Sequence, residues 1–232
     1  MTPSRTGYAV CTLIRSGSTW LAELLDSTGV LGHPAEYFST RFRQRLDTPD
    51  YPSDPADQVD YVLRHGTTPN GVYGFKIYPL QLEGLLQRVR WTERFPALKF
   101  VHWRRRDVLG QALSRTRAVQ TQRWRASFSG VREPAYDGEA ILESITWLAA
   151  QEARWELFFA RNGLEPLRLV YEDALRAPAE TVSAVARLVG LDPAPPADVT
   201  RVGVTVQRDE ITAAWRERFL DEYADLDVFG RL

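Results

Sequence analysis

The chain has 232 residues, and its 29 lysines and arginines nearly balance its 30 aspartates and glutamates, so the formal net charge is −1. This balance gives no support to a general role in binding nucleic acid or a membrane surface. The length suits one substantial core, and we expect residues 1–232 to form a single domain. No apolar run has the length of a signal peptide or a membrane span, so neither is expected.

The few cysteines and histidines narrow the chemistry further. The single cysteine, Cys11, excludes a disulfide framework and fits a reducing, cytoplasmic location. It lies in an apolar run, where we expect it to pack and not to act as a nucleophile. The three histidines, His33, His65 and His102, do not show metal-ligand spacing, so no metal site is expected.

Apolar runs and amphipathic patterns alternate along the chain. Short apolar runs predict strands over 8–14, 72–78, 97–103 and 167–171. Apolar faces at helical spacing predict helices over 19–27, 79–94, 107–125, 139–161, 177–189 and 210–223. Pro, Asp and Ser crowd residues 48–57, which indicates a surface loop. The alternation predicts an α/β fold with a mostly parallel central sheet covered by helices on both faces, whose ligands bind beyond the carboxyl ends of the strands.

The first strand runs directly into a loop with the chemistry of a phosphate cradle, Arg15-Ser16-Gly17-Ser18-Thr19-Trp20. The glycine permits a tight turn, and the helix that follows directs the positive end of its dipole at the turn. An ATP-binding P-loop has lysine where Ser18 stands, and here the basic residue, Arg15, comes first. The alternative is that Ser16 or Ser18 simply caps the helix and no ligand binds.

A second basic cluster, Arg104-Arg105-Arg106, follows the third strand, with Ser114 two turns into the next helix. Arginines grip phosphate through paired charge-assisted hydrogen bonds. The alternative is a solvated charged turn in which Asp107 caps the helix. The strand does not end in the acidic residue that an NTPase uses to hold magnesium. Two anion sites suit a nucleotide with phosphates at both its 5′ and 3′ ends, and favour a metal-independent group transfer.

This pair of sites resembles the two phosphate-binding segments of the sulfotransferases that use 3′-phosphoadenosine 5′-phosphosulfate (PAPS). The resemblance is closest to the bacterial trehalose 2-sulfotransferase family, and it implies a P-loop-like sulfotransferase fold. The segments that carry it span nearly the whole chain: 15–21, 32–38, 69–76, 105–114, 115–124, 169–175, 187–191 and 207–208 with Trp215. One departure is Gly110, where the family often has a hydroxyl residue or alanine, so one phosphate contact is expected to be missing.

The resemblance implies that PAPS is the sulfuryl donor and 3′,5′-ADP (PAP) the product, without a metal. It assigns the 5′-phosphosulfate to the first loop, that is, to Arg15, Ser16, Gly17, Ser18, Thr19 and Trp20. It assigns the 3′-phosphate to Arg105 or Arg106 together with Ser114. Gln207 and Arg208, before the last helix, are further expected cofactor contacts.

The resemblance also assigns the general base of an in-line transfer to Glu36. Sulfuryl transfer to an alcohol needs a base for the hydroxyl proton and positive charge near the transferred group. Arg15 is expected to neutralise the phosphosulfate. Lys76 is either a second cation at the sulfuryl group or a solvated lysine at a strand end. His33 either orients Glu36, touches the acceptor or is structural.

The acceptor is expected to be a hydroxyl of a carbohydrate or glycosylated small molecule, and the family's dimer segment implies a homodimer. Aromatic side chains able to line the acceptor pocket are Trp20, Tyr37, Phe38, Tyr51, Tyr73, Tyr78 and Trp124. Two alternatives stay open: a P-loop kinase or NTPase-like nucleotide-binding protein, and a non-catalytic nucleotide-binding protein that kept the cradle.

Overall fold

A computed structural model describes residues 5–39, 51–122, 133–203 and 210–225 of the chain. Its contacts group the chain into two compact units. Unit 1 comprises Met1–Arg106 and Arg154–Thr205, and unit 2 comprises Asp107–Ala153 and Val206–Leu232. That residues 1–232 act as a single domain stays a prediction.

Unit 1 is built on a four-stranded sheet in the order β2-β1-β3-β4, with every neighbouring pair parallel. The strands are β1 (Thr6–Cys11), β2 (Val72–Ile77), β3 (Leu98–Arg104) and β4 (Leu167–Val170). All four predicted strands are therefore present, and the predicted α/β fold is confirmed. The first strand ends three residues earlier than predicted, because Thr12 already belongs to the loop, where its hydroxyl lies 2.8 Å from that of Ser16.

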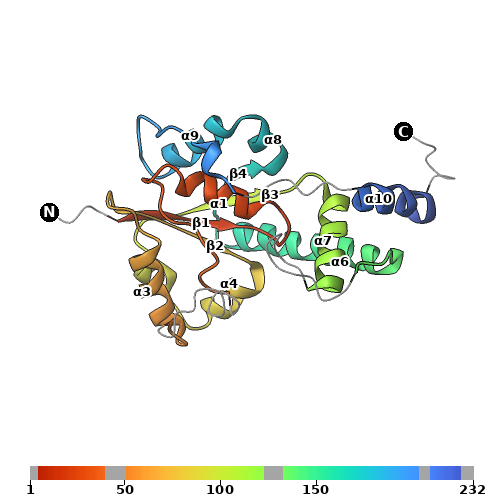
Figure 1. The fold of residues 1–232 in the computed structure, drawn as a ribbon. Coiled ribbons are helices and arrows are strands. Elements are labelled where there is room, and N and C mark those ends of the chain that lie inside the picture. The colour runs from red at the N-terminus through yellow and green to blue at the C-terminus, as the bar shows by residue number, and fades with distance from the viewer. Residues whose placement is uncertain (1–4, 40–50, 123–132, 204–209, 226–232) are drawn as a thin grey trace. The chain divides into compact units, whose positions relative to one another are not determined.

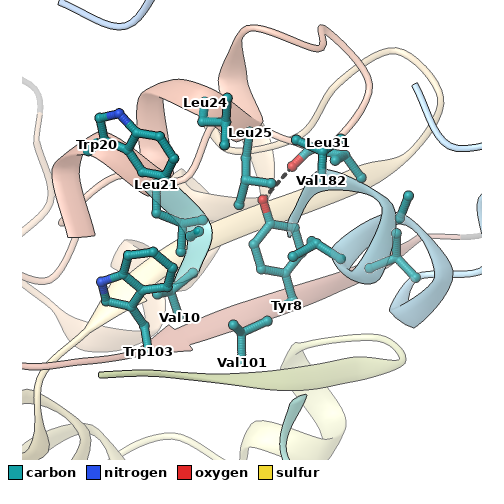
Figure 2. Close-up of a cluster of buried hydrophobic side chains, with 14 of the residues drawn as sticks. Tyr8, Val10, Trp20, Leu21, Leu24, Leu25, Leu31, Val101, Trp103 and Val182 are labelled. Carbon is teal, nitrogen blue, oxygen red and sulfur yellow. Dashed lines mark hydrogen bonds between the residues drawn. The ribbon is translucent and has the colours of Figure 1, made fainter. Parts of the chain in front are cut away.

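One face of this sheet is covered by α1 (Ser18–Asp26), α8 (Tyr171–Arg176) and α9 (Pro178–Leu188) (Figure 1). Alternate strand residues point to this face, among them Tyr8 and Val10 of β1 and Val101 and Trp103 of β3. They pack against leucines of α1 and valines of α9 in a buried apolar cluster (Figure 2). The only polar atom of the Tyr8 side chain is satisfied, because its hydroxyl donates a 2.6 Å hydrogen bond to Leu31 O.

The opposite face carries aromatic side chains. Phe100 of β3 packs against Phe158 and Phe159 at the end of α7 (Gly138–Arg161). Phe75 of β2 stacks on Phe95, which follows the short helix α5 (Trp91–Arg94). Helices α3 (Pro55–His65) and α4 (Pro79–Leu86) lie on the side of the sheet away from α8 and α9 (Figure 1). Helices cover both faces, as predicted.

Several helix boundaries differ from the prediction. The expected helix over 79–94 is two helices, α4 and α5, and α8 precedes the helix expected over 177–189. The loop indicated for 48–57 is wrong at its end, because α3 begins at Pro55, with Asp54 accepting a 2.8 Å bond from Ala56 N. Asp as N-cap followed by Pro at the first helical position starts a helix. Residues 48–50 lie outside the described ranges.

Unit 2 contains α6 (Val108–Thr121), the part of α7 before residue 154, and α10 (Glu210–Tyr223). Its core consists of Leu113, Ile141, Trp215 and Phe219. The prediction for 210–223 is confirmed, and the helix expected over 107–125 is described as far as Thr121. A short 3-10 helix, η1 (Val199–Arg201), belongs to unit 1. Within the described ranges, no helix combines the length and apolar character needed to cross a membrane.

Candidate active site

The loop after β1 is held in a fixed shape by side chains from β3 and the turn beyond it. The indole nitrogen of Trp103 donates to Ser16 O at 3.0 Å, and Arg105 Nη1 donates to Arg15 O at 3.2 Å. Arg15 and Gly17 both adopt positive φ, at 59° and 80°. Residues with positive φ reverse the chain sharply, so the predicted cradle is a tight loop fastened to the neighbouring strand.

Gly17 is required here for two reasons. Its φ of 80° is in the left-handed region, and a Cβ at this position would lie 2.4 Å from Tyr171 Cδ2. Gly17 is also the N-cap of α1 and gives that helix no side-chain cap. The alternative in which Ser16 or Ser18 caps the helix is therefore wrong. The first N–H groups of a helix have no intrahelical acceptor and carry the positive end of the dipole, so this terminus can receive an anion.

The structure brings Glu36 and Lys76 together beside the same helix. Lys76 Nζ lies 3.1 Å from Glu36 Oε1 and donates to Thr19 Oγ1 at 3.3 Å. The segment that carries Glu36 is held beside β2, because Ala35 O accepts a 2.8 Å hydrogen bond from Lys76 N. Lys76 is only 2 % exposed, so its interpretation as a solvated strand-end lysine is wrong. A buried cation and a carboxylate thus adjoin the start of α1.

His33 lies close to Glu36 in sequence, but its imidazole bonds elsewhere. Its Nδ1 pairs with Asp26 at the end of α1, and both side chains are about half exposed. Its backbone N–H donates to Gly66 O at 2.9 Å. Among the described residues, the imidazole therefore orients Asp26 and not Glu36. A contact between His33 and the acceptor stays a prediction.

Arg105 and Arg106, the two arginines predicted to bind the 3′-phosphate, have different surroundings. Arg105 bonds the cradle loop, and its guanidinium lies 5.8 Å from the centre of the Tyr171 ring. Arg106 is tied to α8, because its Nη2 lies 2.6 Å from Asp173 Oδ2 and its N–H donates to Glu172 Oε2 at 2.9 Å. The structure thus places Arg105, and not Arg106, against the loop after β1.

The remaining predicted cofactor contacts lie in unit 2 or outside the described residues. Ser114 is a partly buried residue of α6. Asp107 caps α6 as predicted, accepting from Gly110 N at 2.9 Å. A Cβ on Gly110 would lie 2.0 Å from Asp107 Oδ2 and 2.8 Å from Arg216 Nη2, which explains why a glycine stands there. Gln207 and Arg208 lie outside the described residues.

Most aromatic side chains proposed for a pocket are core residues. Trp20, Tyr37, Tyr51 and Tyr73 are buried, whereas Phe38 and Tyr78 are partly exposed. The indole of Trp20, whose residue was also predicted to bind the cofactor, packs edge-on against Tyr171 at 6.3 Å. Trp124 lies outside the described residues.

Sequence reasoning missed the part played by Tyr171. The sequence analysis places Tyr171 at the end of the fourth strand and in the family-like segment 169–175 but gives it no role. Its ring lies against Gly17 and edge-on to Trp103, at 6.1 Å between ring centres. It is the first residue of α8. Its position at the end of a parallel strand is a signal for such a role, since these ends meet at the ligand-binding edge of the sheet.

Cys11 is buried in β1, as expected for a packing residue. Burial raises the pKa of its thiol well above the ordinary value, because the thiolate would lose its hydration. Such a thiol stays protonated at neutral pH, which does not suit a nucleophile.

Comparison with known proteins places these features in a family context. A sequence model of the Stf0 sulphotransferase family matches residues 7–222. Trehalose 2-sulfotransferase of Mycolicibacterium smegmatis is 31% identical, over 94% of this chain and 96% of that protein. Trehalose 2-sulfotransferase of Mycobacterium tuberculosis is 33% identical, over 80% of this chain and 85% of that protein.

Comparison with solved structures gives matches to more distant proteins. The sulfotransferase domain of the Synechococcus PCC 7002 olefin synthase gives a TM-score of 0.46 at 16% identity, covering 94% of this chain and 95% of that one. Retinol dehydratase in complex with retinol and PAP gives a TM-score of 0.43 at 13% identity, covering 96% and 84%.

Proposed function

Because this chain belongs to the Stf0 sulphotransferase family, we propose that it moves a sulfuryl group from PAPS to a carbohydrate hydroxyl. The observation that carries the proposal is the buried Lys76–Glu36 pair beside the uncapped start of α1. This arrangement supplies a base and a cation next to an anion site. Trehalose is the first acceptor to test, because two relatives that match most of this chain are named for it.

The residues present fit PAPS. The start of α1 has no side-chain cap, and no side chain at Gly17 covers it. We assign the 5′-phosphosulfate to Arg15, Ser16, Gly17, Ser18 and Thr19. Arg105, fastened to the carbonyl of Arg15, is assigned to the 3′-phosphate, with Ser114, Gln207 and Arg208 as further proposed contacts. When bound, PAPS supplies the sulfuryl group that is transferred.

In the proposed reaction, Glu36 accepts the proton of the acceptor hydroxyl on a carboxylate oxygen. Lys76, 3.1 Å from Glu36 Oε1, holds this carboxylate in place. The same ammonium bonds Thr19 in the first turn of α1, so its positive charge also reaches the anion site. Arg15 adds charge that offsets the negative charge growing on the leaving phosphate. The acceptor hydroxyl thus loses its proton to Glu36 next to the Lys76 ammonium. The positive charge of this ammonium stabilises the negative charge that develops on the reacting groups.

The first experiment is calorimetric titration with 3′,5′-ADP, 5′-AMP and ATP, each with and without magnesium. We expect metal-independent, micromolar binding of 3′,5′-ADP, favoured over 5′-AMP by about 2 kcal/mol, because charge-assisted phosphate contacts contribute on that scale. Mass spectrometry then follows transfer from PAPS to trehalose. Magnesium-dependent ATP binding with indifference to the 3′-phosphate would contradict the proposal and favour the kinase or NTPase alternative.

The oligomeric state belongs to the same proposal. We propose a homodimer, because the segment 115–125 resembles the one that forms the dimer in the family. Light scattering after size exclusion tests this, and a mass of one chain at micromolar concentration would contradict it.

A further inference from the structure

Two buried tryptophans each hold a backbone carbonyl of the loop after β1. The indole nitrogen of Trp155, in the part of α7 that belongs to unit 1, donates to Thr12 O at 3.1 Å. The indole nitrogen of Trp103, on β3, donates to Ser16 O at 3.0 Å. Thr12 is the first residue after β1, and Ser16 directly precedes the N-cap of α1. The two indole N–H groups therefore hold the two ends of the loop.

The two indoles reach the loop from opposite faces of the sheet. Trp103 belongs to the apolar cluster on the face that α1 covers (Figure 2). Trp155 stacks on Phe159 at 5.9 Å between ring centres, and Phe159 packs against Phe100 on the other face. This close packing fixes the direction in which the N–H of Trp155 points. Because β1 lies between β2 and β3, the loop at its end is accessible to side chains from both faces.

A hydrogen bond between two hydroxyls joins the held ends of the loop. Thr12 Oγ1 and Ser16 Oγ lie 2.8 Å apart, and both residues are buried. Thr12 N also donates to Ile77 O at 3.2 Å, which ties the start of the loop to β2. A line of hydrogen bonds thus runs from Trp155 through Thr12 and Ser16 to Trp103. A buried network of satisfied hydrogen bonds is rigid, so each indole helps to fix the loop as a whole.

The held carbonyls determine where the N–H groups of the loop point. In a planar trans peptide unit, the C=O of one residue and the N–H of the next point in opposite directions. Trp103 holds Ser16 O, and Arg105 holds Arg15 O at 3.2 Å. The N–H groups of Gly17 and Ser16 therefore point away from β3 and the turn that follows it. Carbonyl oxygens repel an anion, whereas successive N–H groups in such a turn attract one.

We propose that Trp155 is a positioning residue of the anion site. Its N–H fixes Thr12, and the Thr12–Ser16 hydroxyl pair carries this constraint to Ser16. Trp155 thereby helps Trp103 to keep the carbonyl of Ser16 turned away from the 5′-phosphosulfate of PAPS. It acts through the loop and not by contact with the nucleotide. The inference rests on the proposed function and adds to it a residue of α7.

Calorimetric titration with two nucleotides separates positioning from packing. 3′,5′-ADP carries the 5′-phosphate assigned to the loop, whereas adenosine 3′-phosphate (3′-AMP) lacks it. The ratio of the two affinities therefore reports on the loop. Trp155→Phe and Trp103→Phe each remove one indole N–H. Trp91→Phe is the matched control, because the buried indole nitrogen of Trp91 has no hydrogen-bond partner among the described residues. Urea unfolding measures the stability of each variant separately.

A second replacement of Trp155 removes the N–H without leaving a cavity. Benzothienylalanine, incorporated in place of Trp155, keeps the bicyclic shape and has a sulfur where the indole has its N–H. This side chain fills the same space but cannot donate to Thr12 O. It should lose as much affinity for 3′,5′-ADP as Trp155→Phe does, with a smaller loss of stability.

We expect Trp155→Phe to weaken binding of 3′,5′-ADP roughly three- to tenfold, the effect of one hydrogen bond, and that of 3′-AMP less than about twofold. Trp103→Phe should weaken 3′,5′-ADP at least as much, because Ser16 O itself then loses its donor. Trp91→Phe should leave both affinities unchanged.

Equal losses for the two nucleotides in Trp155→Phe would show that Trp155 only packs, and would overturn the inference while leaving the proposed function standing. Unchanged affinity for 3′,5′-ADP in the benzothienylalanine variant would overturn it in the same way. Failure of the wild type to bind 3′,5′-ADP would instead contradict the proposed function.

Discussion

Lys76 Nζ and Glu36 Oε1 lie 3.1 Å apart, although the residues are forty positions apart in the chain. Their side chains are 3% and 15% exposed, so the two charges meet largely out of water. The chain reaches this place by passing close to β2, where a Cβ on Gly32 would lie 2.6 Å from Gly74 N. Poorly hydrated charges interact strongly, so each residue of the pair depends on the other.

We predict that Glu36→Gln abolishes most sulfuryl transfer and leaves the nucleotide site intact. A glutamine cannot accept the hydroxyl proton, and general bases contribute roughly 10²- to 10⁴-fold to rates. Turnover with PAPS and titration with 3′,5′-ADP measure the two effects. Glu93→Gln, on an exposed residue paired with Arg90, is the control and should keep full activity. Full turnover in Glu36→Gln would remove Glu36 from the mechanism.

The free energy of unfolding should reveal the coupling between Lys76 and Glu36 independently of catalysis. Lys76→Met leaves the Glu36 carboxylate without its cation, and losing one partner of a buried pair costs about 3–5 kcal/mol. Glu36→Gln leaves a buried ammonium that still bonds Thr19, so a smaller loss is expected. Urea unfolding of both single variants and the double variant gives the interaction energy. We expect the double variant to lose clearly less than the sum, and additive losses would show that the pair is not coupled.

Arg105 and Arg106 should differ in their effect on nucleotide preference. Arg105→Gln should reduce the preference for 3′,5′-ADP over 5′-AMP by about 1.5–3 kcal/mol, the usual contribution of a hydrogen bond to a charged group. Arg106→Gln is the matched control, because its side chain pairs with Asp173 and is 56% exposed. Calorimetry with the two nucleotides measures both preferences. If the Arg106 variant alone loses the preference, the assignment of the 3′-phosphate must be reversed.

Gly17 should tolerate no side chain, and Gly29 provides the comparison. Both residues have positive φ, but a Cβ on Gly29 meets no atom within 4 Å, whereas one on Gly17 would collide with Tyr171. Gly29→Ala should therefore cost only backbone strain, about 1–2 kcal/mol. Gly17→Ala should cost more than this and abolish binding of 3′,5′-ADP. Urea unfolding and titration check this, and equal losses with retained binding would contradict a cradle at Gly17.

The sequence was sufficient to predict features that depend on local pattern. The four strands, the tight loop after β1 and the helix over 210–223 follow from short apolar runs, a glycine turn and apolar spacing. The partner of Lys76 could not be predicted, because it depends on how the segment around Ala35 runs beside β2. Which of Arg105 and Arg106 is proposed to hold the 3′-phosphate likewise depends on α8, whose carboxylates bind Arg106. The sequence analysis did not separate this helix from its neighbours.

An ion pair outside the candidate site should make part of the stability depend on pH. Arg168 contacts both carboxylate oxygens of Glu156, at 2.6 and 2.8 Å. These hydrogen bonds lower the pKa of Glu156. The positive charges of Arg168 and Arg104 also lower it, whereas partial burial of the carboxylate acts in the opposite direction. Arg168 also donates to His102 Nδ1 at 2.9 Å, so it links the pair to β3.

Because the folded pKa of Glu156 lies below its unfolded value, the ionised pair stabilises the fold at neutral pH, and this contribution is lost as pH falls through the folded pKa. Glu156→Gln should therefore lower the free energy of unfolding at pH 7 by about 0.2–1 kcal/mol, since both side chains are nearly half exposed. Urea unfolding at pH 7, 5 and 3 should show the difference from wild type shrinking toward acid. Glu165→Gln, at an exposed position, is the control. A difference that stays constant down to pH 3 would show that Glu156 acts through packing and not through its charge.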